Sequence, residues 1–300
     1  MNITKSGLVA LVGRPNVGKS TLLNRLAGEK IAIVSDKPQT TRRRISAVVV
    51  RGACQFVFLD TPGFHKPRNR LGEYMLQVAR DSAGGVDAVA LVVEPIPRVG
   101  TPETLLLERL SAGDTPVLLV INKVDTVPKA SLLPVIEAYR QAFRFAAVVP
   151  LSAREGDGTD LLLNELEPLL PEGPPLYPEG QVTDQPEREL IAELVREKLL
   201  NHLDKEVPHG VAVMVDTLRE RENKLVEISV TILCEKESHK GILIGKRGAM
   251  LKTVGEEMRA ELEEMYEGPV LFQSWVKVRA DWRNNPGQLH NLGFDTGALK

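Results

Sequence analysis

A glycine-rich run near the amino end constrains this chain more than any other feature. Residues 13–20 read GRPNVGKS, which matches the pattern G-x-x-x-x-G-K-[ST] in full. The run lies between an apolar stretch expected to be a buried strand and a segment, 19–28, expected to be helical. Glycines let successive backbone amides point at phosphate oxygens, and a helix N-terminus favours anions. We therefore predict a phosphate-binding loop in which Lys19 reaches the β- and γ-phosphates and Ser20 binds Mg²⁺. The residues expected to contact a nucleotide here are Gly13, Arg14, Pro15, Asn16, Val17, Gly18, Lys19, Ser20 and Thr21.

Apolar runs and segments of helical spacing alternate through the first half of the chain. The runs expected to form strands are 6–12, 45–50, 55–59, 88–93, 117–121 and 146–150. The segments expected to form helices are 19–28, 71–83, 101–111, 130–143 and 160–169. Such alternation is typical of βαβ units. It predicts an α/β domain with a doubly wound, mostly parallel sheet, whose functional loops follow the carboxyl ends of the strands.

A second motif, NKVD, indicates which base the nucleotide carries. Asn122, Lys123, Val124 and Asp125 come directly after the run at 117–121. The carboxylate of Asp125 can accept from both N1–H and the exocyclic amine of guanine, whereas adenine would leave it unpaired. Taken alone, the motif is equally consistent with a loop in which Asp125 caps a helix. Together with the phosphate-binding loop, it predicts a guanine nucleotide.

A third motif, DTPG at 60–63, follows the run at 55–59. Asp60 is placed to hold Mg²⁺ through a water, and the amide of Gly63 is a candidate sensor of the γ-phosphate. A turn with proline at its second position fits the same residues and is compatible with this role. The other residues expected at this part of the site are Thr61, Pro62 and Phe64.

The chain changes character near residue 168. The stretch 168–180 contains five prolines, which lack amide donors and suit neither helices nor central strands. It predicts a semi-rigid linker, with a long surface loop inside one domain as the alternative. Beyond it we expect helix, strand, strand, helical turn, helix and strand, an α+β order similar to that of a KH domain. The predicted division is 1–167 for the nucleotide-binding domain, 168–182 for the linker and 183–300 for a KH-type RNA-binding domain.

A G-x-x-G sequence at 245–248 is the candidate RNA-binding loop of this second domain. Its two inner residues, Lys246 and Arg247, are basic, and glycines allow a nucleic-acid backbone to approach. The alternative is a solvated helix-entry turn, because residues 181–300 hold 17 Lys and Arg against 21 Asp and Glu. The residues expected to contact RNA are Lys240, Ile242, Ile244, Gly245, Lys246, Arg247, Gly248 and Lys252. The candidates to extend this surface are Trp275, Trp282, Lys277, Arg279 and Arg283, although for Trp275 a place in the core is the favoured interpretation.

Composition excludes several other classes. The chain has only two cysteines and five scattered histidines, which argues against a disulfide framework, a Cys-rich zinc site and a metal hydrolase. Its apolar runs are too short to span a membrane, and the N-terminal residues lack a signal-peptide pattern. The net charge of −2 gives no general attraction to nucleic acid, so RNA binding needs a local patch. We expect a cytoplasmic protein.

The motifs in this order, with Ser152 and Ala153 after the last strand, are those of a translation-factor-class GTPase. The text GRPNVGKSTLLN, PQTTRRR, DTPG, NKVD and LSA resembles the Era family of bacterial ribosome-assembly GTPases over essentially the whole chain. The resemblance implies that 38–44 is a switch loop. Thr41 is then the contact to Mg²⁺ and the γ-phosphate, with Thr40 as the alternative, and Lys19, Thr41, Asp60 and Gly63 form the catalytic set. Without the other motifs, a solvated polar turn would be the simpler interpretation of 38–44.

Hydrolysis is expected to be slow. Ras-like GTPases place a water-orienting glutamine after DxxG, whereas this chain has Phe64, which cannot orient water by hydrogen bonding. Asn16 resembles the asparagine that helps bind K⁺ in potassium-activated relatives, and K⁺ would act as a fixed charge near the β–γ bridge.

The resemblance further implies binding of the 3′ end of 16S rRNA and a role in assembly of the small (30S) ribosomal subunit. The leading hypothesis is a switch whose RNA affinity depends on GTP or GDP, working as a monomer. Peripheral association with the inner face of the cell membrane is suggested for relatives. The alternatives are a constitutive RNA-binding scaffold that holds guanine nucleotide structurally, and a GTPase acting on tRNA.

Overall fold

The computed structural model describes residues 3–64, 67–82 and 84–295, which form two compact units. The first unit is built mainly from the chain up to Asp184, and the second mainly from Gln185 onward. Two short segments, Ser35–Thr40 and Arg68–Tyr74, group with the second unit although they precede it in sequence. Among the described residues, no helix combines the length and apolarity needed to cross a membrane.

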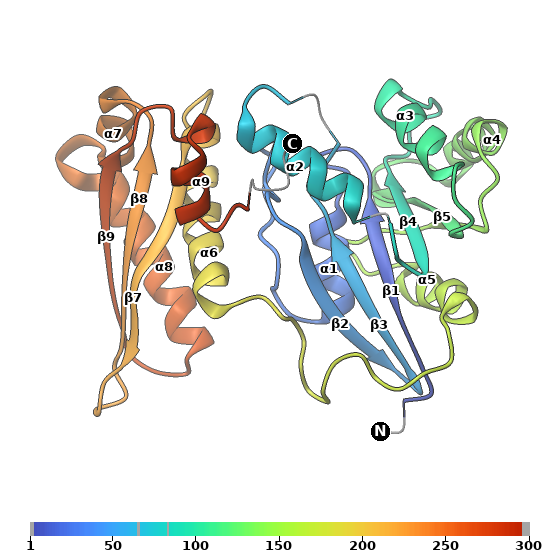
Figure 1. Cartoon of the computed structure of the whole chain (residues 1–300), viewed down its shortest axis with the longest axis horizontal. Coiled ribbons are helices and arrows are strands. Elements are labelled where there is room, and N and C mark those ends of the chain that lie inside the picture. Colours follow the sequence, from blue (N-terminus) through green and yellow to red (C-terminus); the bar gives the residue numbers. More distant parts are fainter. Residues whose placement is uncertain (1–2, 65–66, 83, 296–300) are drawn as a thin grey trace. The chain divides into compact units, whose positions relative to one another are not determined.

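A six-stranded sheet forms the centre of the first unit (Figure 1). Its strands, in the spatial order β2-β3-β1-β4-β5-β6, are β2 (Ile45–Arg51), β3 (Cys54–Asp60), β1 (Lys5–Val12), β4 (Ala88–Val93), β5 (Val117–Ile121) and β6 (Ala147–Pro150). All neighbouring pairs are parallel except β2–β3, which is antiparallel at the edge. The predicted doubly wound, mostly parallel sheet is therefore confirmed.

Helices cover both faces of this sheet because its strands are apolar on both sides. The helices are α1 (Lys19–Ala27), α2 (Arg70–Asp81), α3 (Thr101–Leu110), α4 (Leu132–Ala142) and α5 (Thr159–Leu166). On β1, Val9 and Leu11 pack with apolar side chains of α1 and α5 in one core. Ala10 and Val12 pack with those of α3 and α4 in a second core. Each buried leucine or valine contributes about 1.5–3 kcal/mol. Two cores thus fix the strand ends from which the functional loops emerge.

The proline-rich stretch is hydrogen-bonded to the first unit along most of its length. The carbonyl of Pro171 accepts from the amide of Ser6 at 3.2 Å, and the carbonyl of Val182 accepts from Val48 at 2.7 Å. Between them, the side-chain oxygen of Gln55 accepts from the amides of Leu176 and Tyr177. Because these bonds hold it, the segment is more constrained than the predicted semi-rigid linker. The domain boundaries at 167 and 183 stay predictions.

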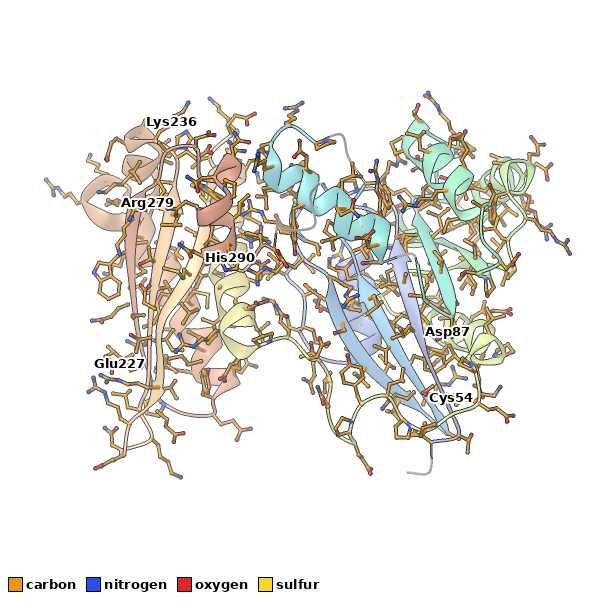
Figure 2. The ribbon with its side chains drawn as sticks, in the orientation of Figure 1. Cys54, Asp87, Glu227, Lys236, Arg279 and His290 are labelled. Carbon is orange, nitrogen blue, oxygen red and sulfur yellow. The ribbon has the colours of Figure 1, made fainter. Side chains whose placement is uncertain are left out.

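The second unit has a three-stranded sheet covered by helices. Its elements are α6 (Glu187–His202), β7 (Ala212–Glu220), β8 (Val226–Cys234), α7 (Glu237–Ile244), α8 (Ala249–Met265), β9 (Val270–Val278) and α9 (Pro286–Asn291). The sheet order is β7-β8-β9, with β7–β8 antiparallel and β8–β9 parallel. Near the β7–β8 turn, Glu227, labelled in Figure 2, pairs with Arg219 and Arg221, which lower its pKa. The predicted α+β order is confirmed, and α9 is an addition that the sequence pattern did not indicate.

The burial of the two tryptophans differs from the favoured interpretation. Trp282 is completely buried, and its Nε1 donates to the carbonyl of Gly210 at 2.9 Å. Trp275 is 48% exposed because its partner in the β8–β9 register is Thr231, on the face opposite the buried Val230 and Ile232. The prediction of a core Trp275 is therefore wrong, and Trp282 cannot extend an RNA-binding surface.

Candidate functional site

The predicted phosphate-binding loop links β1 to α1 and surrounds a buried ammonium group. Lys19 is 6% exposed, and its Nζ donates to the carbonyls of Gly13 at 3.2 Å and Arg14 at 2.9 Å. Burial lowers the pKa of Lys19, and the nearby Asp60 carboxyl opposes that shift. A buried cation that donates to backbone carbonyls gains strongly from an anion at the same place. The loop is thus built to receive phosphate oxygens at the N-terminus of α1.

Two glycines of the motifs are required by close approach. A Cβ on Gly18, whose φ is +96°, would lie 2.2 Å from the Nδ2 of Asn122. A Cβ on Gly63 would lie 2.5 Å from the backbone nitrogen of Pro15. The amide of Phe64 also donates to the carbonyl of Gly13 at 3.3 Å. The DTPG segment therefore packs directly on the phosphate-binding loop, as a γ-phosphate sensor must.

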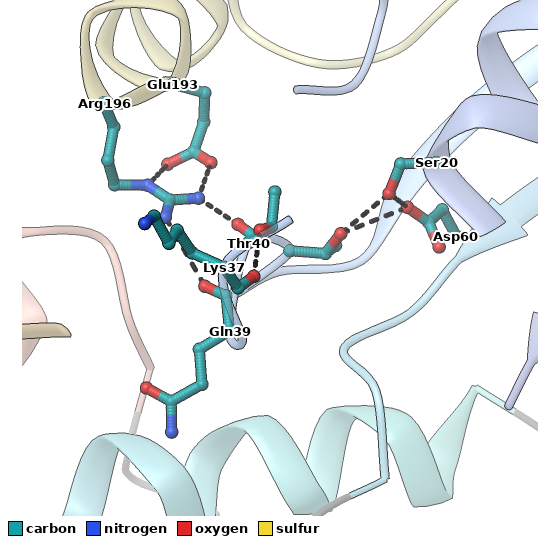
Figure 3. Close-up of polar contacts among 8 residues, drawn as sticks. Ser20, Lys37, Gln39, Thr40, Asp60, Glu193 and Arg196 are labelled. Carbon is teal, nitrogen blue, oxygen red and sulfur yellow. Dashed lines mark hydrogen bonds and ion pairs between the residues drawn. The ribbon is translucent and has the colours of Figure 1, made fainter. Parts of the chain in front are cut away.

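Three oxygen-bearing side chains converge beside this loop, drawn in part in Figure 3. The hydroxyl of Ser20 donates to Oδ2 of Asp60 at 2.6 Å and lies 2.9 Å from the hydroxyl of Thr41. Thr41 also donates to the same carboxylate oxygen at 3.3 Å. Burial raises the pKa of Asp60, and the charge of Lys19 and the hydrogen bonds from the two hydroxyls oppose this increase. Within the described residues, the other Asp60 oxygen, Oδ1, is buried without a hydrogen-bond partner. Hard oxygen donors with spare acceptor capacity fit Mg²⁺.

The structure distinguishes between the two threonines of the predicted switch loop. The hydroxyl of Thr40 donates to the carbonyl of Lys37 at 2.6 Å, so it is Thr41 that lies with Ser20 and Asp60. Thr41 and Arg42 are 8% and 2% exposed. The alternative of a solvated polar turn therefore fails for the central residues of 38–44.

The NKVD motif joins three loops by hydrogen bonds. The buried side chain of Asn122 donates to the carbonyl of Val17 at 2.8 Å and accepts from the amide of Ala153 at 2.9 Å. Lys123, which has a φ of +62°, donates to the carbonyl of Asn16 at 2.7 Å. Asn122 and Lys123 therefore fix the phosphate-binding loop relative to the segment that carries Ser152 and Ala153.

Asp125 lies at a pocket next to this junction. Its side chain is exposed, and with Ser152, Val124 and Pro150 it lines an open pocket of about 420 Å³. A carboxylate at the mouth of a partly apolar pocket can accept from a base edge that enters it. The predicted guanine contact is sterically accessible.

Two acidic residues of the site escaped the sequence interpretation. Glu94 pairs with Lys123 at 2.6 Å, and the buried Glu103 of α3 pairs with Arg14 of the phosphate-binding loop. Glu94 directly follows β4, where the carboxyl ends of the strands meet, so its position could have indicated this role. Glu103 lies at helical spacing with Leu106, Leu107 and Leu110 on the buried face of α3. An acidic residue on an otherwise apolar helix face could have indicated that Glu103 has a buried partner.

The second candidate site is the G-x-x-G turn between α7 and α8. Gly245, Arg247 and Gly248 have φ of +74°, +53° and +80°, and a Cβ on Gly245 would lie 2.7 Å from the Cβ of Met250. Lys246 and Arg247 are exposed at the N-terminus of the 17-residue helix α8. The turn thus presents two cations at a helix end that favours phosphate.

The remaining predicted RNA contacts surround this turn. Ile242 is 51% exposed, Ile244 is partly exposed and Leu243 between them is buried. Lys252 is exposed, and Lys240 is partly buried on α7. Ile242 therefore offers an apolar surface on which a base could lie, next to the basic turn.

Two acidic residues of α8 pair with α6 and not with the turn, whereas Glu256 lies 3.7 Å from Lys252 beside the turn. Glu257 lies 2.8 Å from His202, and Glu261 lies 2.6 Å from Lys198, both on α6. These carboxylates are thus directed toward α6. The net negative charge of the second half favoured the solvated turn. Part of that charge is paired with cations of a neighbouring helix.

Asn122→Ala should destabilise the first unit and weaken guanine nucleotide binding together. It removes both bridging bonds and leaves a buried carbonyl and amide unsatisfied, which costs about 1–3 kcal/mol of unfolding free energy. Urea unfolding followed by circular dichroism, with GTP calorimetry, measures both effects. Asn201→Ala, the same change at an exposed residue of α6, is the control and should alter neither. Unchanged stability of Asn122→Ala would show that the bridge is not a structural support.

Comparisons with known proteins match the two regions of the chain that contain these candidate sites. A family model described as 50S ribosome-binding GTPase matches residues 8–123, and a KH domain model matches residues 206–283. GTPase Era of Ruminiclostridium cellulolyticum is 48% identical over 292 residues, which cover 97% of this chain and 98% of that protein. GTPase Era of Clostridioides difficile is 46% identical over 293 residues, covering 97% and 99%.

Two solved structures are similar along nearly the whole chain. A variant of Aquifex aeolicus Era bound to GDP·AlF4⁻ has a TM-score of 0.92 and is 37% identical, covering 97% of this chain and 99% of that one. Era in complex with MgGDPNP and a segment of 16S ribosomal RNA has a TM-score of 0.93, with the same identity and coverage. The predicted KH-type fold of the second half is thereby confirmed. With its phosphate-binding loop, its NKVD junction and relatives of nearly identical extent, the chain belongs to the Era family of GTPases.

Proposed function

We propose that this GTPase is a switch that binds the 3′ region of 16S rRNA and acts in assembly of the 30S ribosomal subunit, with an RNA affinity set by GTP or GDP. The observation that carries the proposal is that one chain holds both the phosphate-binding loop and the basic G-x-x-G turn. An Era structure 37% identical to this chain holds a GTP analogue and 16S RNA together.

The nucleotide is held by groups with distinct tasks. Backbone amides of the loop and Lys19 bind the phosphates, and the amide of Gly63 responds to the γ-phosphate. Ser20, Thr41 and Asp60 hold Mg²⁺, directly or through water. When bound, the ion neutralises charge on the β- and γ-phosphate oxygens. Asp125 accepts from the guanine edge, and Ser152 and Ala153 line the base next to it.

Slow hydrolysis follows from the residue after DTPG. Phe64 is partly buried and packs on the core that includes α3 and α4, so its ring is held by hydrocarbon contacts. A phenyl ring has no hydrogen-bonding group with which to orient an attacking water. Chemistry must therefore rely on positioning and on positive charge at the phosphates.

The RNA segment is held by the turn and the exposed apolar side chains beside it. Gly245 and Gly248 let the backbone approach, Lys246 and Arg247 neutralise phosphates, and Ile242 and Ile244 contact bases, with Lys240 and Lys252 at the margins. These contacts suit a single strand, since its bases can leave the stack.

Lys246→Gln combined with Arg247→Gln should weaken binding of a single-stranded 16S 3′-end RNA in both nucleotide states. The salt slope of binding should fall by about one per lost phosphate contact. Lys205→Gln combined with Lys224→Gln removes the same charge from other exposed positions of the second unit and is the control. Fluorescence anisotropy across a salt series measures both slopes.

The wild-type chain separates the candidate functions in the same assay. A switch predicts unequal RNA affinity with GDP and with a non-hydrolysable GTP analogue, whereas a constitutive scaffold predicts equal affinity.

RNA crosslinked to the protein in cells should be the 3′ end of 16S rRNA, and recovery of tRNA would contradict the proposal. The cytoplasmic location, the monomeric state and peripheral association with the inner membrane face stay predictions.

GTP hydrolysis should be faster in K⁺ than in Na⁺ if Asn16 helps to bind an activating ion. Asn16 is exposed in the phosphate-binding loop with a φ of +63°, and Lys123 fixes its carbonyl. A well-placed charge at the phosphates should accelerate the reaction about tenfold or more. Phosphate release in matched chloride buffers measures this, and Asn16→Ala should remove the difference. Equal wild-type rates in the two salts would refute the K⁺ role.

A further inference from the structure

A buried arginine of α6 holds the segment that precedes Thr41. Arg196 is 1% exposed, and its guanidinium donates to the carbonyl of Gln39 at 3.4 Å and to the carbonyl of Thr40. On its other side it donates from Nε to Glu193 at 3.0 Å and forms a second bond to the same carboxylate (Figure 3). The segment Ser35–Thr40 groups with the second unit, to which these contacts attach it.

This contact is built as a specific site. A guanidinium has five donors in a fixed plane, and here it places pairs of them on a carboxylate and on two successive carbonyls. Burial of a charge is unfavourable unless it is paired, and Glu193, on the preceding turn of α6, supplies the pair. Gln39 adopts a φ of +63°, which turns its carbonyl and the next one toward α6. An exposed ion pair between Lys37 and Asp204 at 2.8 Å adds a second attachment of the same segment.

One peptide group separates this contact from the phosphate site. The carbonyl of Thr40 and the amide of Thr41 belong to the same planar unit, so holding one fixes the direction of the other. The hydroxyl of Thr41 lies 2.9 Å from Ser20 and 3.3 Å from Asp60, the oxygens suited to Mg²⁺. A shift of Thr41 caused by the γ-phosphate must therefore move the Thr40 carbonyl or break its bond to Arg196.

We infer that Arg196 is the positioning residue through which the nucleotide state of the first unit reaches the RNA-binding unit. The inference rests on the proposed switch and names the group that transmits it. Since coupling between two ligands is reciprocal, RNA bound to the second unit changes the affinity for GTP by the same factor, through the same contact.

Lys198 provides a matched control on the same helix. Its ammonium pairs with Glu261 of α8 at 2.6 Å and has no part in holding Ser35–Thr40. Loss of either cation removes one charge from α6. Only loss of Arg196 frees the carbonyls of Gln39 and Thr40.

The test compares the full-length wild type, Arg196→Met and Lys198→Met. The dissociation constant of a single-stranded 16S 3′-end RNA is measured by anisotropy with GDP and with a non-hydrolysable GTP analogue. Wild type and Lys198→Met should show a nucleotide-dependent ratio of at least about fivefold, whereas Arg196→Met should bring the ratio to within about twofold of one. In the absence of RNA, Arg196→Met should bind GDP with the affinity of the wild type, because Arg196 contacts neither the phosphate-binding loop nor Asp125.

Retention of the wild-type ratio by Arg196→Met would overturn the inference. A wild-type ratio of one would instead refute the proposed switch itself, which separates the two failures. Should Arg196→Met not fold, Arg196→Lys keeps the charge but not the planar pair of donors, and it should give an intermediate ratio. Amide exchange of residues 35–41 gives a second readout. It should differ between nucleotide states in the wild type but accelerate equally in both states in the Arg196 variants.

Discussion

A buried ammonium surrounded by backbone dipoles is the interaction on which the rest of the structure depends. The carbonyls of Gly13 and Arg14 accept hydrogen bonds from the amine of Lys19, and the Asp60 carboxyl opposes the lowering of the Lys19 pKa by burial. That arrangement is more favourable with anionic phosphates present, so nucleotide binding and local stability act in the same direction. The position of the phosphate-binding loop relative to Lys19 therefore matters for both binding and stability.

Three neighbouring segments hold the phosphate-binding loop in place. Asn122 ties it to the segment after β6, Glu103 holds Arg14 from α3, and Gly63 allows the DTPG segment to pack on Pro15. Preorganisation of this kind matters because the donors then pay no reorganisation cost when charge develops during the reaction. The same logic extends to the switch loop, where Arg196 restrains Thr40 while Thr41 lies at the oxygens of Ser20 and Asp60.

Sequence patterns predicted the parts that are local and missed those that depend on packing. The glycine spacing, the NKVD motif and the alternation of strands and helices are short-range signals, and each led to the right fold. The role of Asn122 as a bridge between loops depends on three segments far apart in sequence, so only the base contact was expected. Trp275 was placed in the core because the alternation along β9 indicated apolar content but not which face the helices cover. Trp282 lies beyond β9, where no alternation indicates burial. Arg196 was overlooked because it lies among the apolar positions of α6 but carries a charge, which normally indicates exposure to solvent.

Guanine selection at Asp125 is the claim that most directly joins the site to its chemistry, and calorimetry of the full-length chain with GTP and ATP in Mg²⁺ tests it. The account predicts that GTP binds at least about a thousandfold more tightly than ATP, since adenine leaves the carboxylate without its two donors. ATP binding as tight as GTP binding, or no binding of either, would contradict it.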